Sequence, residues 1–221
     1  MRLLIQRAAR AVATIGVALL ALIGLTAGPV SATVTHVVVS GAAVNGAFSA
    51  STSNAALTDS VTGFTMPCYF SASPEYAGQT LTNGTYTSSP PLPRAATVTS
   101  ASLMCALSYT FYGTPQALPW SLNLTGPTAA GGRTPATVSG LRVSLSGLPA
   151  PCSLTLAGTS ATTGATVGGY FTNPGGLKLD GSGDLHIWNA GNCGSWFSSG
   201  DAAALTGDFS VNPTSLAFTA S

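Results

Sequence analysis

His186 is the side chain best suited to act as a general base, because a neutral imidazole can accept a proton near pH 7. Serines and aspartates that could complete a triad are plentiful. A triad also needs a nucleophile held beside the base, and the chain contains no Gly-x-Ser-x-Gly elbow. If Leu185 and Ile187 face inward, His186 and Trp188 face outward beside each other. We therefore predict no catalytic residues, and a secreted hydrolase centred on His186 is a less favoured alternative.

Asp180 and Asp184 flank the segment Gly181-Ser182-Gly183, which places them at the two feet of an expected hairpin. Two carboxylates at a turn can hold Ca²⁺ together with main-chain carbonyls. However, Asp and Gly are also the residues that tight turns select, and no EF-hand pattern completes the loop. We interpret the segment as a turn and predict neither a metal site nor a cofactor. Nothing in the sequence places this pair across a sugar cleft, as a glycosidase would require.

Aromatic and amide side chains gather around Cys193 in the sequence. Trp188, Asn192 and Trp196, together with His186, form the candidate ligand-binding group. Aromatic rings with amide partners can stack on sugars, and this use favours a carbohydrate- or cell-wall-binding module. Packing of the tryptophans in the core against a disulfide explains the same residues equally well.

The chain has four cysteines: Cys68, Cys105, Cys152 and Cys193. An even number without a Cys-x-x-Cys pair indicates two disulfides formed in an oxidising compartment, and only two histidines are present to support a zinc site. Three connectivities are possible. We favour Cys68–Cys105 with Cys152–Cys193, because each half of the chain then closes its own loop.

Apolar and polar residues alternate along much of the chain, which is the pattern of half-buried strands. The alternating segments are 103–111, 118–125, 141–146, 152–157, 177–180 and 205–211, with further strands expected near 34–39, 61–66 and 167–171. Gly-rich turns separate them, and no long helical periodicity follows residue 32. The sequence predicts an all-β fold, an antiparallel β-sandwich or barrel-like single domain spanning residues 33–221.

The first 32 residues have the pattern of a cleavable secretory signal peptide. Three arginines precede the apolar run Ala11–Leu25, and Val30-Ser31-Ala32 supplies small residues for cleavage after Ala32. The apolar run is shorter than a membrane-spanning helix needs, so we expect no stable membrane anchor after cleavage. The protein is predicted to be secreted, extracellular or associated with the cell envelope.

Charge is scarce: charged residues make up 6% of the chain, and the precursor has a net charge of +1. After removal of residues 1–32, four cations face six carboxylates, a net charge of −2. No cluster of Lys and Arg is available to neutralise phosphates, which excludes nucleic acid as a partner. Few titratable groups also means few candidates for an acid, base or nucleophile.

A series of short motifs in the C-terminal half carries a family resemblance. They are Leu118-Pro119-Trp120, the strand 152–158 that begins at Cys152, the segment 190–194 around Cys193, Gly200-Asp201-Ala202 and the segment 205–213. Together they resemble a group of small secreted actinobacterial proteins with four cysteines and a Ser/Thr/Gly-rich β domain. The resemblance covers about residues 67–213 and implies no catalytic or ligand residues, because the group has no assigned activity. Pro151 stands where that group has Gly, a change expected to affect a turn only.

We expect a secreted, non-enzymatic β protein that binds a partner or forms part of the cell surface. Its partner is unidentified; cell-wall carbohydrate and a surface protein are the two candidates. A membrane-inserting barrel, which the low charge permits, is less favoured because the alternating segments are mostly shorter than a membrane-spanning strand needs.

Overall fold

The computed structural model describes residues 34, 36–41, 47–75, 84–87, 94–148 and 151–221. Polar and apolar residues alternate along the chain, and the inward positions carry β-branched, aromatic and Leu side chains. This pattern favours extended backbone. The described residues form fifteen strands: β1 (His36–Ser40), β2 (Ser49–Asp59), β3 (Thr65–Glu75), β4 (Gly84–Thr87), β5 (Arg94–Ala106), β6 (Thr110–Pro115), β7 (Trp120–Leu124), β8 (Arg133–Leu141), β9 (Val143–Leu148), β10 (Ser153–Ala157), β11 (Ala165–Thr172), β12 (Gly176–Gly183), β13 (His186–Gly191), β14 (Ala203–Asn212) and β15 (Ala217–Ala220).

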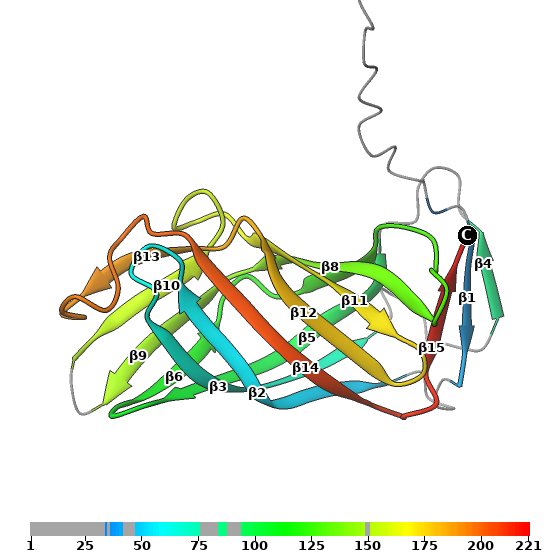
Figure 1. Cartoon of the computed structure of the whole chain (residues 1–221), viewed down its shortest axis with the longest axis horizontal. Helices are drawn as coiled ribbons and strands as arrows, with labels where there is room; N and C mark the ends of the chain where they lie inside the picture. The colour runs from blue at the N-terminus through cyan, green and yellow to red at the C-terminus, as the bar shows by residue number, and fades with distance from the viewer. Residues whose placement is uncertain (1–33, 35, 42–46, 76–83, 88–93, 149–150) are drawn as a thin grey trace, which may run out of the picture. The chain divides into compact units, whose positions relative to one another are not determined.

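Eight of these strands close into an antiparallel barrel (Figure 1). Around the ring they follow the order β5, β3, β2, β14, β12, β11, β8 and β7, and β7 then pairs with the first part of β5. Closure pairs strands that would otherwise be free edges. The expectation of an all-β, antiparallel, barrel-like domain is confirmed, and the barrel replaces the sandwich alternative.

Strand β5 is long enough to take part in two structures. Its residues 94–98 pair with β7, whereas residues 103–106 pair with β6. From there β6, β9, β10 and β13 continue the sheet beyond the barrel, and we call these four strands the extension. The end of the extension returns to the start of β14, because the Ile187 N–H donates to the Asp201 carbonyl and the Ala203 N–H to the Leu185 carbonyl, both at 2.8 Å.

A second, three-stranded sheet of β15, β1 and β4 lies against one end of the barrel (Figure 1), and we call it the cap. Its Phe218 packs edge-on against Phe171 at 4.8 Å and Phe48 at 6.3 Å between ring centroids. Asn173 accepts the Phe218 N–H at 2.8 Å and donates its amide to the Phe218 carbonyl at 2.6 Å. The Thr134 hydroxyl donates to the same carbonyl at 2.8 Å. Phe218 pairs with Val39 of β1 along one edge of β15, and side chains of the barrel take the place of a strand along the other edge.

The inward face of the strands forms the core. Its largest fully buried side chains are Trp120, Phe171, Phe218, Leu57, Met66, Leu141, Leu145, Leu154, Leu156, Ile187 and Leu205. In β2, Ala50 and Ala55 are both buried although they are an odd number of residues apart. A bulge between Thr52 and Ala55 absorbs the odd step and keeps both on the inward face.

Both disulfides join the predicted pairs. Cys68–Cys105 links directly opposed residues of β3 and β5, and Cys152–Cys193 links the residue before β10 to the loop after β13. Disulfides of this kind indicate folding in an oxidising environment.

The predicted strand over residues 103–111 is wrong at its centre, because the chain reverses there. β5 ends at Ala106 and β6 begins at Thr110, with the Leu107 N–H donating to the Tyr109 carbonyl at 3.0 Å. Cys105 pairs directly with Phe111, so both face inward. The alternation of residue types in the sequence therefore runs through the turn without a break. Periodicity alone therefore did not reveal the hairpin.

The predicted hairpin at residues 180–184 is also absent, because β12 continues to Gly183. Gly183 pairs with Val167 of β11 across a register shift. Its φ of 126° is one that residues with a side chain rarely adopt, and an added Cβ would lie 1.9 Å from the Thr166 carbonyl oxygen. Gly181 and Gly183, which predicted a turn, instead belong to a bulge in β12.

Two other predicted segments have different limits in the structure. Residues 141–146 belong to two strands, since β8 ends at Leu141 and β9 begins at Val143, and of residues 61–66 only Thr65 and Met66 lie in a strand. The predicted signal peptide, residues 1–32, lies outside the described residues. Among the residues that are described, none belongs to a helix able to cross a membrane.

Candidate functional site

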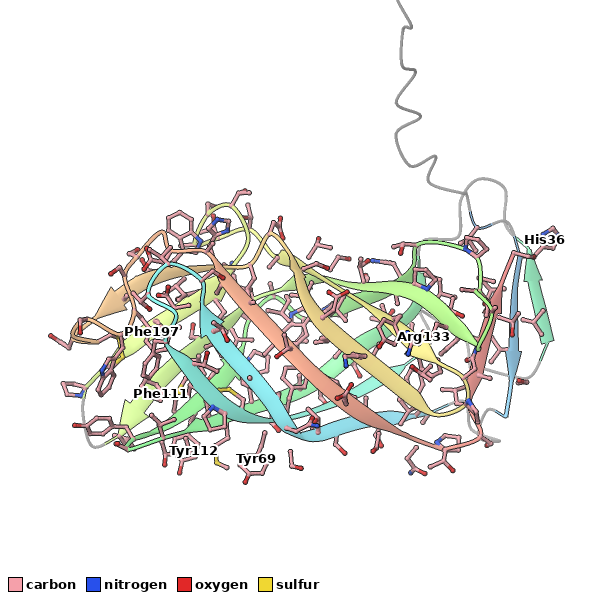
Figure 2. All side chains as sticks on the ribbon, in the orientation of Figure 1. His36, Tyr69, Phe111, Tyr112, Arg133 and Phe197 are labelled. Carbon is pink, nitrogen blue, oxygen red and sulfur yellow. A yellow bond between two sulfur atoms is a disulfide. The ribbon has the colours of Figure 1, made fainter. Side chains whose placement is uncertain are left out.

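A row of large side chains crosses three strands on the outward face of the sheet. Tyr69 of β3 pairs with Met104 of β5, and Met104 pairs with Tyr112 of β6. Tyr69 is 52% exposed and Tyr112 is 54% exposed, and Figure 2 shows both projecting from the same side of the sheet. Two strand spacings, about 9.6 Å, separate their positions. The row presents two aromatic side chains to solvent.

The row lines a surface hollow of about 420 Å³. Serine and threonine hydroxyls stand beside the tyrosines, and the hydroxyls of Ser71 and Ser102 are hydrogen-bonded to each other at 2.8 Å. A second hollow of about 560 Å³ shares Ser51 and Thr52 with the first. Its lining is polar: Ser51, Thr52, Ser53, Asn54, Asp208 and Ser210. We call the two adjoining hollows the trough.

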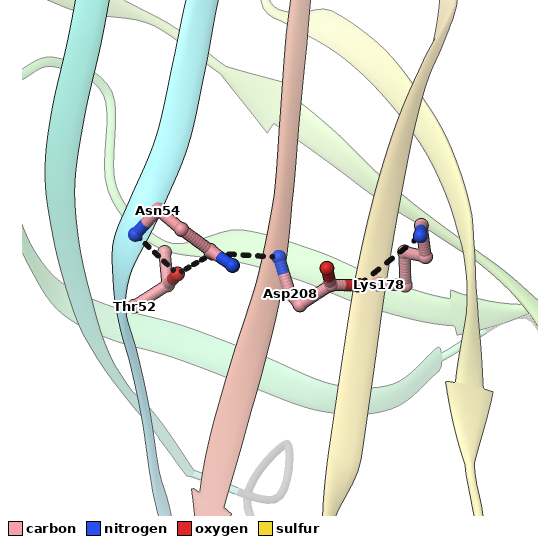
Figure 3. A network of polar contacts seen from close by, with 4 residues as sticks. All are labelled: Thr52, Asn54, Lys178 and Asp208. Atoms are coloured by element: carbon pink, nitrogen blue, oxygen red, sulfur yellow. Dashed lines mark hydrogen bonds and ion pairs between the residues drawn. The ribbon is translucent and has the colours of Figure 1, made fainter.

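Asn54 organises the polar end of the trough (Figure 3). Its Oδ1 accepts the Thr52 hydroxyl at 2.5 Å and the Asp208 N–H at 3.2 Å, and its main-chain N–H donates to the Thr52 hydroxyl at 3.1 Å. Asp208 forms an ion pair with Lys178 at 3.3 Å. Because Oδ1 is occupied, the Asn54 side-chain amide N–H₂ group is the part that remains to donate to a ligand.

The trough exists because the strand ladder is interrupted on both sides of β2. The pairing of β2 with β3 shifts between Thr52 and Ala55, and the pairing of β14 with β2 shifts between Thr206 and Ser210. Extra residues in a ladder bend the strand and redirect its side chains. The bulge therefore turns Ser53 and Asn54 out of the sheet toward solvent.

The trough offers stacking surfaces and hydrogen bonds rather than the groups of a hydrolytic centre. Asp208 is the carboxylate in its lining, and the Lys178 ammonium neutralises it. The paired charges leave no strong preference for an ionic ligand. This combination of exposed rings, hydroxyls and one amide can bind an uncharged, hydroxyl-rich molecule.

The predicted ligand-binding residues are divided between two places. His186 and Trp188 lie on the same face of β13, with ring centroids 6.2 Å apart. Both are half-buried. The Trp188 indole donates to the Gly158 carbonyl at 2.9 Å, and His186 Nδ1 lies 2.8 Å from the Asp184 carbonyl oxygen. The imidazole thus contacts a main-chain carbonyl rather than a carboxylate or a nucleophile.

Trp196 has a different set of neighbours. Its ring stacks on Phe64 with centroids 5.6 Å apart and planes 7° apart, and it packs against Tyr109 at 5.4 Å. The Thr62 hydroxyl donates to the Trp196 carbonyl at 3.2 Å. Asn192 is exposed, with a φ of 56°. Trp196 therefore packs against the core, joining the turn after β2 to the loop before β14.

Asp180 and Asp184 are each occupied by separate donors. Asp180 Oδ1 accepts the Ser182 hydroxyl at 2.6 Å and the Ser182 N–H at 3.0 Å, and these bonds, the hydroxyl first, lower the pKa of Asp180. Asp184 Oδ1 accepts the Thr166 N–H at 2.5 Å. Each carboxylate thus stabilises its own stretch of main chain around the bulge in β12.

Asp59 and Asp201 form a carboxyl pair that sequence reasoning missed. Asp59 ends β2 and is fully buried; its Oδ1 accepts the N–H groups of Val61 and Thr62 at 2.9 Å each. Its Oδ2 has no hydrogen-bond donor among the described residues. Ala203, two residues after Asp201, pairs with Asp59. Partial burial raises the pKa of Asp201, and the charge of Asp59 raises it further.

The sequence contained signals for some of these residues. Ala55, Leu57 and Asp59 share one face of an alternating strand, so a carboxylate at the third position was a candidate for burial. Tyr69 and Tyr112 each stand next to a core residue, Cys68 and Phe111, and so take the outward phase. For Asn54 the sequence held no signal, because its position depends on the bulge.

Comparisons of the chain with protein families, with curated proteins and with solved structures found no match. The resemblance to secreted actinobacterial proteins stays a prediction.

Proposed function

We propose that this chain is a non-enzymatic, exported binding module that holds an uncharged polysaccharide in the trough. The observation that supports this most directly is the row of Tyr69, Met104 and Tyr112 beside the polar hollow of Asn54. The apolar face of a sugar ring stacks on an aromatic ring, while its hydroxyls bond to amide and hydroxyl groups. Export is supported by the two disulfides and by the signal peptide predicted at residues 1–32.

The ligand is expected to lie across the strands. Tyr69 and Tyr112 are separated along the direction in which the strands pair, and the polar hollow continues in that direction through β2 to β14. A chain of linked sugars stacked on the tyrosines would therefore reach the Asn54 amide. The glycan of a cell wall has this extended, hydroxyl-rich character.

Retention on insoluble chitin, cellulose and peptidoglycan tests the proposal. We expect the protein to be retained on at least one of them, and the double variant Tyr69→Ala/Tyr112→Ala to lose about 2 kcal/mol of binding, close to thirtyfold in affinity. The matched control Tyr69→Phe/Tyr112→Phe keeps both rings and should bind within about threefold of the native protein.

The variant Trp188→Phe tests whether the polysaccharide binds in the trough or at the residues that the sequence analysis singled out. Trp188 lies on β13, in the extension, so its substitution should leave retention unchanged. Loss of retention in Trp188→Phe but not in the tyrosine double variant would move the site to β13. Failure of the native protein to bind any of the three polysaccharides would overturn the carbohydrate proposal and leave a surface protein as the partner to test.

A further inference from the structure

The closed barrel contains an internal cavity of about 40 Å³. It lies on the opposite side of the sheet from the trough, between side chains of all eight barrel strands. Phe70 forms part of its wall, with ring centroids 6.5 Å from Trp120 and 5.4 Å from Phe209. Ala50 and Val138 also line it. Every residue of the lining is apolar, and no polar atom is exposed to the cavity.

The lining determines what the cavity can hold. A buried water needs two to four polar partners, and an apolar cavity without them stays dry; a dry cavity of about 150 Å³ binds benzene or xenon. At about 40 Å³ this cavity exceeds the roughly 10–15 Å³ that a single water requires, but it is too small for a benzene ring and fits an apolar occupant of about xenon's size. Polar solutes are excluded because their hydrogen bonds would be lost on entry.

The end of the cavity beside the cap is closed by packed aromatic rings. Phe48 and Phe171 are part of its lining, and both contact Phe218 of the cap. Phe218 is held by hydrogen bonds from Asn173 and Thr134. The cap therefore shields this end of the barrel from solvent.

An eight-stranded barrel is just wide enough either for its side chains to fill the interior or for one small ligand to remain inside. We propose that the interior of this barrel is a binding site for one uncharged, apolar molecule no larger than about xenon's size, held between Phe70, Trp120 and Phe209. Phe70 also lines the first hollow of the trough, whereas Tyr69, Tyr112 and Asn54 do not line the cavity, so the proposal does not depend on the residues proposed to bind polysaccharide.

Xenon is the probe that tests this proposal on the whole folded protein. Methyl NMR under xenon pressure should show saturable shifts at Val138 and Leu122, which line the cavity. The NMR signals of the Leu145 and Leu156 methyl groups, in the extension, should not shift. Xenon should also raise the melting temperature in a pressure-dependent manner.

Two variants of the lining should act in opposite directions. Ala50→Val adds methyl groups at the wall and should weaken xenon binding by at least about fivefold. Val138→Ala enlarges the cavity and should strengthen binding, so the proposal can still be tested if the Ala50→Val protein folds poorly. Ala204→Val adds the same methyl groups on the outward face of β14 and serves as the matched control, with unchanged binding expected.

The proposal is overturned if the native protein shows no saturable response to xenon. It is also overturned if Ala50→Val, folded as judged by its spectrum, binds xenon as tightly as the native protein. Shifts at Leu145 and Leu156 without shifts at Val138 would place the apolar site in the extension and would contradict it too.

Discussion

Asp59 and Asp201 bring two hydrogen-bond acceptors together at the end of β2. Asp59 is buried, and its Oδ2 has no donor in the described part of the chain. Partial burial, and after it the negative charge of Asp59, raises the pKa of Asp201 and so favours the protonated form of that side chain. The pair should therefore favour the folded state more at acidic pH than at neutral pH.

The sign of the effect can be measured with Asp201→Asn. A pKa raised by folding contributes stability that is fully present below the unfolded value of about 3.9 and is lost as the pH rises through the folded value. At pH 7 the variant should melt at a higher temperature than the native protein, because the repulsion is gone. Toward pH 3 this advantage should shrink or reverse. An identical difference at pH 3 and pH 7 would contradict a raised pKa for Asp201.

Asp180→Asn should show the opposite dependence on pH. Hydrogen bonds from Ser182 lower the pKa of Asp180, so its contribution is present above the unfolded value and is lost as the pH falls through the folded value. We expect the variant to melt below the native protein at pH 7 and to match it near pH 2. Melting curves at both pH values, recorded beside those of Asp201→Asn, test the two signs together.

At the scale of elements, β15 pairs with β1 along one edge, and side chains of the barrel position it along the other edge. Asn173 satisfies both the N–H and the carbonyl of Phe218, and Phe218 places a fully buried ring against Phe171. A side-chain amide offers the same donor and acceptor as a peptide group, so it can substitute for a missing strand at one residue. Asn173 thus acts at Phe218, and Thr128 has the same role at Ala220, whose N–H donates to the Thr128 hydroxyl and whose carbonyl accepts the Thr128 N–H.

Asn173→Ala should destabilise the protein by about 1–3 kcal/mol, because it leaves the buried Phe218 N–H without its acceptor. Denaturant unfolding measures this loss. Asn173→Asp keeps an acceptor for the N–H but replaces the donor to the carbonyl with a negative charge, and should also destabilise. Faster hydrogen exchange confined to β15 and β1 would localise the effect to the cap; unchanged exchange there would contradict it.

At the scale of the whole molecule, the two disulfides close loops in different halves of the chain. Their cysteines are 37 and 41 residues apart in sequence. Cys68–Cys105 links two strands of the barrel wall that are already paired, whereas Cys152–Cys193 holds the loop that carries Trp196. Both restrict the unfolded chain to a similar extent, because loop entropy depends only weakly on length.

Replacing either pair with alanines should lower the free energy of unfolding by about 2–5 kcal/mol. The measurement is the denaturation midpoint of Cys68→Ala/Cys105→Ala and of Cys152→Ala/Cys193→Ala. Only the second should increase the mobility of Trp196, read from the NMR relaxation of its own indole N–H, which is resolved from those of Trp120 and Trp188. Equal relaxation in both variants would show that Phe64 and Tyr109 hold Trp196 without the disulfide.

Local patterns in the sequence were enough for the fold class and for the covalent framework. Strand periodicity is a property of neighbouring residues, so 205–211 predicts β14 and 152–157 predicts β10 with little knowledge of the rest of the chain. The pairing of Cys68 with Cys105 followed from the order of the cysteines. The same local logic failed where a turn preserved the alternation, as at Leu107, and where glycines formed a bulge, as at Gly183.

Tertiary structure decided which residues meet. Whether Trp196 faces solvent or Phe64, whether Asp59 faces Asp201, and whether Asn54 leaves the sheet all depend on strands far apart in sequence. Register and closure are set by the total burial of many side chains, so they cannot be read from a window of a few residues. The alternation of residues thus determined that the chain forms strands, and the long-range pairing of β5 with both β7 and β6 determined a barrel with an extension, an internal cavity and a trough.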